Sequence, residues 1–226
     1  MLEWDTVHAA ARRQKLDVVT YGTSEECICR LLRYDAANQQ AHARIRDREI
    51  IFRIGAAGYH MALNGLAVLA AVSALGHPLE PAIAQLERFA ALPGRGEEIH
   101  LSLDGRRLTV IDDAYNANPG SMRAALARLS DHPDGRRRIA VLGEMAELGP
   151  GAVAYHTELA TFMQNRSIDE VHVIGELYID FWEAIPPALR GFHARTGQAL
   201  KDVLRERLAD GDVVLLKGSH STGMHE

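Results

Sequence analysis

VIDDAYNANPGSM, residues 110–122, leads an apolar strand into a helix through a strongly polar turn. Asn118 followed by Pro119 predicts the helix start, because an amide side chain caps a first turn and proline fits the first helical position. The cap leaves the other polar side chains of the turn unexplained: Asp112, Asp113, Tyr115 and Asn116. Carboxylates beside a helix N-terminus suit ribose hydroxyls or a metal-bound phosphate, whereas an elaborate Asx turn is the purely structural alternative.

The composition is that of a water-soluble globular protein. Of 226 residues, 47% are hydrophobic and 24% are charged, and the net charge of -5 argues against a nucleic-acid partner. No signal peptide is evident, and the longest apolar stretch, residues 61–76, is interrupted by Asn64 and too short to span a membrane. Cys27 and Cys29 are too few for a zinc site. We therefore expect a cytoplasmic protein that binds neither membrane nor nucleic acid.

The second part of the chain alternates strands and helices. Strands are predicted at residues 98–104, 106–113, 138–144, 170–175, 191–194 and 212–218, and helices at 119–130, 151–165, 177–185 and 197–208. Alternation of this kind predicts βαβ units, so the fold class is α/β with a mostly parallel sheet. The strands are Val, Ile and Leu runs, as expected when helices cover both faces of a sheet.

The first part follows a different pattern. Strands are predicted at residues 17–22, 27–35, 40–47 and 49–55, and helices at 5–15, 59–75 and 79–91. Arg46–Arg48 is polar between two alternating segments and predicts a hairpin turn. We place a domain boundary near Pro93 and Gly94, which gives domains at residues 1–93 and 94–226.

Three further polar clusters also follow predicted strands or the boundary, where open α/β sheets bind ligands. VLGEMAELGPG (residues 141–151) carries Glu144 and Glu147, LLKGSHSTG (215–223) carries Lys217, and LPGRGE (92–97) carries Arg95. The alternatives are solvated acids in a plain loop, a strand-end lysine in water, and an interface salt bridge. The sequence contains neither a P-loop nor a G-x-G-x-x-G fingerprint, so it offers no phosphate-binding loop of its own.

Together these motifs resemble the Mur ligase family, and within it the branch that adds D-Ala-D-Ala to UDP-MurNAc-tripeptide in peptidoglycan synthesis. The resemblance rests on DDAYNANPGSM, GEMAELG, VLLKGS and the helix GYHMALNGLAVLAAVSALG. It implies that residues 1–93 are the last part of an α/β central ATPase domain and that residues 94–226 are a Rossmann-like C-terminal domain. The N-terminal domain, the P-loop and most ligands of Mg²⁺ are then missing, and no metal ligand is predicted in this chain.

The resemblance also implies a role for each motif residue in binding ATP and D-Ala-D-Ala. Asn64 is expected at adenine, Arg95 at the phosphates as the catalytic cation, and Asp113 at the ribose, with Tyr115, Asn116 and Asn118 shaping the ATP cleft. Glu147, His156, Lys217 and Ser219 are expected near the dipeptide. Three positions depart from the family pattern: Tyr59 and Met61 flank the helix histidine, and His220 stands where arginine is common.

Several interpretations stay open at this point. By resemblance the chain is part of an ATP-dependent ligase that is inactive alone, and self-association through the incomplete sheet of residues 1–93 is expected. A module that binds nucleotide or dipeptide without chemistry is an alternative. Another amide ligase, such as a folylpolyglutamate synthase, is a second alternative.

Overall fold

A computed structural model describes residues 4–56, 58–90, 93–134 and 136–224. The chain divides into two compact units, residues 1–90 and 91–226, and each unit has a hydrophobic core of its own. Among the described residues, none of the helices has both the length and the apolar character that crossing a bilayer requires.

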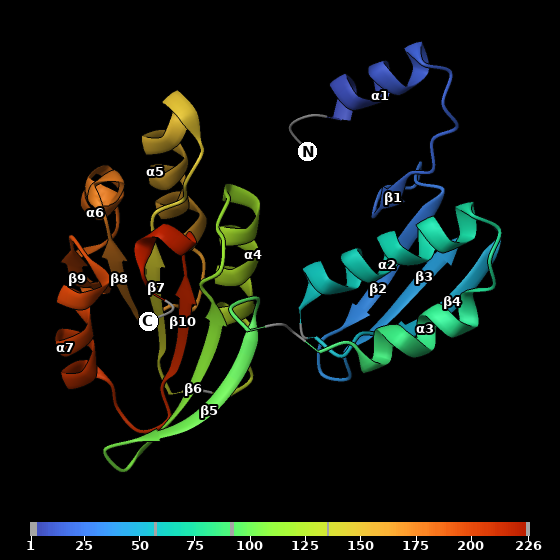
Figure 1. The fold of residues 1–226 in the computed structure, drawn as a ribbon. Helices are drawn as coiled ribbons and strands as arrows, with labels where there is room; N and C mark the ends of the chain where they lie inside the picture. The colour runs from blue at the N-terminus through green and yellow to red at the C-terminus, as the bar shows by residue number, and fades with distance from the viewer. Residues whose placement is uncertain (1–3, 57, 91–92, 135, 225–226) are drawn as a thin grey trace. The chain divides into compact units, whose positions relative to one another are not determined.

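The first unit is a four-stranded sheet with two helices packed on one face (Figure 1). Its elements are α1 (Trp4–Arg13), β1 (Tyr21–Gly22), β2 (Cys29–Asp35), β3 (Gln40–Ile45), β4 (Arg48–Arg53), α2 (Tyr59–Ala74) and α3 (Leu79–Arg88). Strands β2, β3 and β4 are antiparallel, and β1 pairs parallel with β2. Arg46 has a φ of 54°, so the predicted hairpin turn is confirmed.

Alternation along the strands explains why this sheet has a single buried face. In β3 every second residue is buried, and Ala41 and Ala43 contribute to the same core as Leu66 of α2 and Leu86 of α3. Small residues in the middle strand allow the helices to approach the sheet closely. On the opposite face Ile51 is 54% exposed.

The second unit is a six-stranded sheet in the order β5-β6-β10-β7-β8-β9. Its strands are β5 (Glu97–Leu103), β6 (Arg106–Asp113), β7 (Arg138–Gly143), β8 (Glu170–Ile174), β9 (Arg190–Ala194) and β10 (Val213–Lys217), and its α-helices are α4 (Pro119–Ser130), α5 (Ala152–Met163), α6 (Ile179–Ala184) and α7 (Gly197–Arg207). Only the β5–β6 pair is antiparallel, so the predicted α/β fold with a mostly parallel sheet is confirmed.

Helices cover both faces of this sheet. Helices α4, α5 and α6 pack on one face through residues such as Leu126, Leu159 and Phe181, and α7 packs on the other through Leu200 (Figure 1). The last strand of the chain, β10, lies between β6 and β7, and its Lys217 is in register with Asp113 and Leu142. The loops that follow β6, β7 and β10 therefore meet at one edge of the sheet.

Candidate functional site

The turn after β6 begins the helix α4 as the sequence predicts. Asn118 Oδ1 accepts a hydrogen bond from the Ser121 N–H (2.9 Å), and Ser121 Oγ accepts one from the Asn118 N–H (3.0 Å). Pro119 occupies the first turn of this capping box. The exposed Asn118 side chain therefore serves as the N-cap of α4.

Asp112, near the end of β6, binds the segment that contains Arg95 through hydrogen bonds. Its two carboxylate oxygens accept hydrogen bonds from the N–H groups of Gly94 (3.1 Å) and Ala114 (3.2 Å). The Tyr115 N–H in turn donates to the Gly94 carbonyl (2.9 Å). Gly94 has a φ of +71° and lies so close to Tyr115 that a Cβ would meet its side chain at 3.2 Å, so the position strongly favours glycine.

Arg95 and Tyr115 form an exposed stacked pair above this junction. The Arg95 guanidinium carbon lies 4.1 Å from the centroid of the Tyr115 ring, and that ring is 50% exposed. His220 approaches the same tyrosine with a centroid separation of 6.1 Å. Stacking orients a guanidinium while its N–H groups stay free to bind an anion.

Asp113 and Lys217 form a largely buried ion pair at the ends of neighbouring strands. Lys217 Nζ lies 3.0 Å from Asp113 Oδ2, and the lysine is only 1% exposed. Burial raises the pKa of the Asp113 carboxyl, and Lys217 opposes that rise. Burial likewise lowers the pKa of the Lys217 ammonium, and Asp113 opposes that fall.

The loop after β7 is held from two sides. The Met145 N–H donates to His156 Nε2 (3.0 Å), and His156 Nδ1 donates to the Ala152 carbonyl (2.7 Å), which fixes a neutral imidazole. Burial lowers the pKa of this fully buried histidine. The Ala146 N–H donates to Ser219 Oγ (2.8 Å), so the loop after β10 supports the loop after β7.

The remaining predicted residues are accessible. Glu147 is exposed with a φ of 61°, and Asn116 is exposed with its Oδ1 accepting from the next N–H (2.8 Å). Asn64 belongs to the other unit, where it is exposed on α2 and places Nδ2 3.8 Å from Met61 Sδ. The structure thus brings nine of the ten predicted residues into the second unit, while Asn64 stands alone in the first.

The sequence patterns name two further residues, Asp112 and Glu144, but the resemblance assigns neither a role of its own in the site. Asp112 is grouped there with Asp113, although successive strand residues point to opposite faces and could have been separated on that ground. Glu144 accepts a hydrogen bond from the Leu177 N–H (2.8 Å) and so ties the loop after β7 to the one after β8. This bond joins residues 33 positions apart, so no local sequence pattern predicts it.

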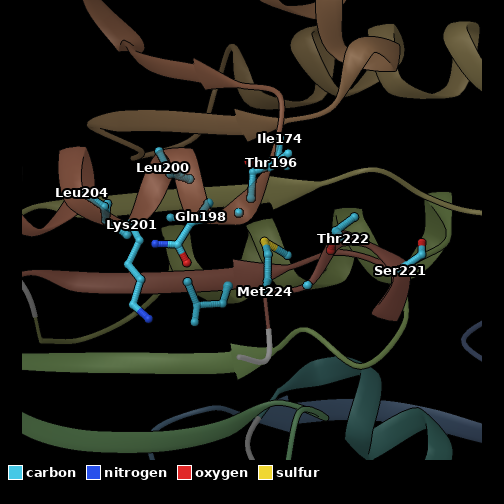
Figure 2. Close-up of a pocket in the computed structure, with 13 residues that line it drawn as sticks. Ile174, Thr196, Gln198, Leu200, Lys201, Leu204, Ser221, Thr222 and Met224 are labelled. Carbon is cyan, nitrogen blue, oxygen red and sulfur yellow. The ribbon is translucent and has the colours of Figure 1, made fainter.

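The described residues around this site include no cluster of metal-ligating side chains. Within the part of the chain that the structure describes, no three His, Cys, Asp or Glu side chains gather to hold a metal ion. A pocket of about 380 Å³ opens instead beside α7, between Gln198 and Lys201 on the helix and Thr222 and Met224 after β10 (Figure 2). None of the ten predicted residues lines it.

Comparisons with known proteins identify the family. The family described as "Mur ligase, glutamate ligase domain" matches residues 94–220, more than half of the chain. The chain belongs to the Mur ligase family. It is 36% identical over 205 residues to the UDP-N-acetylmuramoyl-tripeptide–D-alanyl-D-alanine ligase of Mycobacterium tuberculosis, covering 81% of this chain and 39% of that ligase.

Further relatives give the same result. The Bacillus subtilis ligase of the same name is 30% identical over 214 residues, which cover 92% of this chain and 45% of the relative. Crystal structures of MurF from Acinetobacter baumannii and of MurF from Thermotoga maritima with ADP share the fold, with TM-scores of 0.80 and 0.74 at 23% and 24% identity. They cover 98% and 97% of this chain, which in turn covers 48% and 49% of them. The chain therefore spans less than half the length of these relatives.

Proposed function

We propose that this chain supplies the C-terminal part of an ATP-dependent ligase that joins D-Ala-D-Ala to UDP-MurNAc-tripeptide in the cytoplasm. The observation that carries the proposal is the meeting of three motif loops, after β6, β7 and β10, at one sheet edge. The names of the relatives supply the substrates. On this proposal residues 1–93 are the end of the central domain and act with a P-loop that another part of the ligase provides.

The accessible residues suit the nucleotide. Asp113 Oδ1 has no hydrogen-bond partner among the described residues, so it is available to accept a ribose hydroxyl. The exposed Arg95 guanidinium, oriented by Tyr115, suits a phosphate. Asn64 of the first unit is assigned to adenine, and the family resemblance assigns Mg²⁺ to ATP and to ligands elsewhere in the ligase.

The loops after β7 and β10 are assigned to the dipeptide. Glu147 is exposed and suits the ammonium group of D-Ala-D-Ala, whereas His156 and Ser219 shape the loop from beneath. In the reaction the tripeptide carboxylate takes the γ-phosphoryl group of ATP and releases ADP. The dipeptide amine then attacks the acyl phosphate, loses a proton and expels phosphate. Positioning and charge neutralisation by cations are the chain's contribution.

A chimaera tests the proposal. The segment of the Mycobacterium tuberculosis ligase that matches this chain is replaced by this chain, and phosphate release is measured with ATP, Mg²⁺, UDP-MurNAc-tripeptide and D-Ala-D-Ala. We expect release that requires every substrate from the chimaera, and none from this chain alone. A folded chimaera that binds nucleotide without turnover would indicate a non-catalytic module instead. Turnover with glutamate in place of D-Ala-D-Ala would indicate a folylpolyglutamate synthase type of ligase.

A further inference from the structure

Of the three lysines in the sequence, Lys217 alone is buried in the described structure, whereas Lys15 and Lys201 are exposed. An ammonium group has three N–H donors and is costly to bury unless each finds an acceptor. Lys217 Nζ contacts the Asp113 carboxylate (3.0 Å), the Asp113 carbonyl (3.2 Å) and the Asn116 carbonyl. Two hydrogen bonds to carbonyls and one ion pair therefore hold this ammonium group within the protein.

These acceptors lie close together, since Asp113 ends β6 and Asn116 lies in the turn that leads from β6 to α4. The Asp113 carbonyl is at the start of the turn, and the Asn116 carbonyl lies two residues before Asn118, the N-cap of α4. The lysine that reaches them ends β10, which is next to β6 in the sheet. A single ammonium group thus connects the two ends of the turn to the neighbouring strand.

We propose that Lys217 is a positioning residue that holds the Asp113–Asn116 turn in shape and directs one Asp113 oxygen outward, and that it does not itself touch substrate. The inference rests on the proposed function, because the outward oxygen matters through the ribose it accepts from. Lys217 engages Oδ2, which leaves Oδ1 as the accessible acceptor on a side chain that is 25% exposed. Other charged groups near the pair are Asp112 and Arg128 around Asp113, and Arg95 around Lys217.

Nuclear magnetic resonance on this chain tests the pair without any ligand. With ¹⁵N-labelled lysine, we expect one slowly exchanging ammonium signal, which disappears in Lys217→Met and persists in Lys201→Met. With ¹³C-labelled aspartate, Lys217→Met should raise the pKa of Asp113, because its carboxylate loses the one ion-pair partner that it has among the described residues. Lys201→Met, the matched control, should leave that titration unchanged.

A second variant tests the inference if Lys217→Met does not fold. Asp113→Asn retains an acceptor oxygen but removes the charge, so the Lys217 ammonium signal should shift and exchange about tenfold faster, as loss of a charged hydrogen bond implies. An Asp113 titration unchanged by Lys217→Met, or an ammonium signal unchanged by Asp113→Asn, would overturn the inference. Titration of the same samples with ADP separates this inference from the proposed function. If the Lys217–Asp113 pair behaves as expected but the chain binds no ADP, the positioning role of Lys217 is supported and the proposed nucleotide site is not.

Discussion

The two units carry their candidate residues in different ways. In the second unit, Asp112, His156 and Ser219 hold three loops through hydrogen bonds to backbone N–H groups. In the first unit, Asn64 lies on the exposed side of α2 with one weak contact to Met61. The difference indicates that the motif residues of the second unit hold the loops of the candidate site in place through contacts within that unit. A role for Asn64 depends on groups that the unit does not supply.

The largest effect is expected from the core that supports the turn after β6. Leu126 of α4 is fully buried, so Leu126→Ala should lower the free energy of unfolding of the second unit by about 2–5 kcal/mol. Native-state hydrogen exchange of β7 amides measures it. Leu66→Ala in α2 is the matched change in the first unit, and its cost should appear in the amides of β3. A loss under about 1 kcal/mol for Leu126→Ala would contradict the close packing of α4 on the sheet.

Acidification should weaken the second unit. Burial lowers the folded-state pKa of His156 and His172 below the ordinary value of 6.5, so the unfolded chain takes up protons at higher pH than the folded one. Their stabilisation is complete above that value and is lost as the pH falls through the folded pKa values, by at most about 1.4 kcal/mol per pH unit for each histidine. Denaturant unfolding between pH 7.5 and 5.5 measures the slope.

The contribution of His156 is isolated by His156→Gln. Glutamine retains an acceptor for the Met145 N–H but does not titrate, so the variant should show a smaller loss on acidification. Carboxyl groups contribute alike to both proteins and cancel in the comparison. Equal slopes for the two proteins would remove His156 from the explanation.

The cap of α4 should matter less than its core. Asn118→Ala removes the acceptor for the Ser121 N–H and should cost about 1 kcal/mol of unfolding free energy. Asn116→Ala is the matched control two residues earlier. Among the described residues its side chain accepts only from the adjacent N–H, so its cost should stay within about 0.5 kcal/mol. Thermal unfolding of both variants gives the comparison, and a reversed order would show that the capping box does not govern the turn.

Loss of Arg95 should cost less stability than loss of the α4 cap. Arg95→Ala removes an exposed cation–π contact with Tyr115, which is worth about 0.5–1 kcal/mol. In the ligase chimaera the same change should reduce turnover far more than stability, because the cation is assigned to the phosphates. Turnover and unfolding free energy are measured on one preparation. Losses of equal size would place Arg95 among the structural residues.

Local patterns predicted most of the fold. The predicted strands β6 to β10 and the predicted start of α4 at Asn118-Pro119 are confirmed, because strand periodicity and helix capping depend on neighbouring residues. Helix α3 begins at Leu79 as predicted, but it ends at Arg88 and not at residue 91, because Phe89 takes an extended conformation. The antiparallel β5–β6 pair was missed, although Asp104 and Gly105, both with positive φ, form a typical hairpin turn.

The site was less predictable because its contacts are non-local. The sequence singled out Lys217 as a strand-end cation, but its burial follows from the insertion of β10 between β6 and β7. His156 was assigned by resemblance, whereas its contact with Met145 depends on how α5 packs beneath the loop after β7. Strand order and helix packing determine these contacts, and no short segment of the sequence predicts either.

The central claim is that the candidate site is shaped within the second unit before any ligand binds. The most direct test is hydrogen exchange, in the ligand-free chain, of six amides that donate to side chains around the site: Gly94, Ala114, Ser121, Met145, Ala146 and Leu177. We predict that all six exchange at least about tenfold more slowly than in an unstructured peptide, as formed hydrogen bonds require. Exchange of these amides at unstructured rates, with β7 and β10 still protected, would contradict the claim.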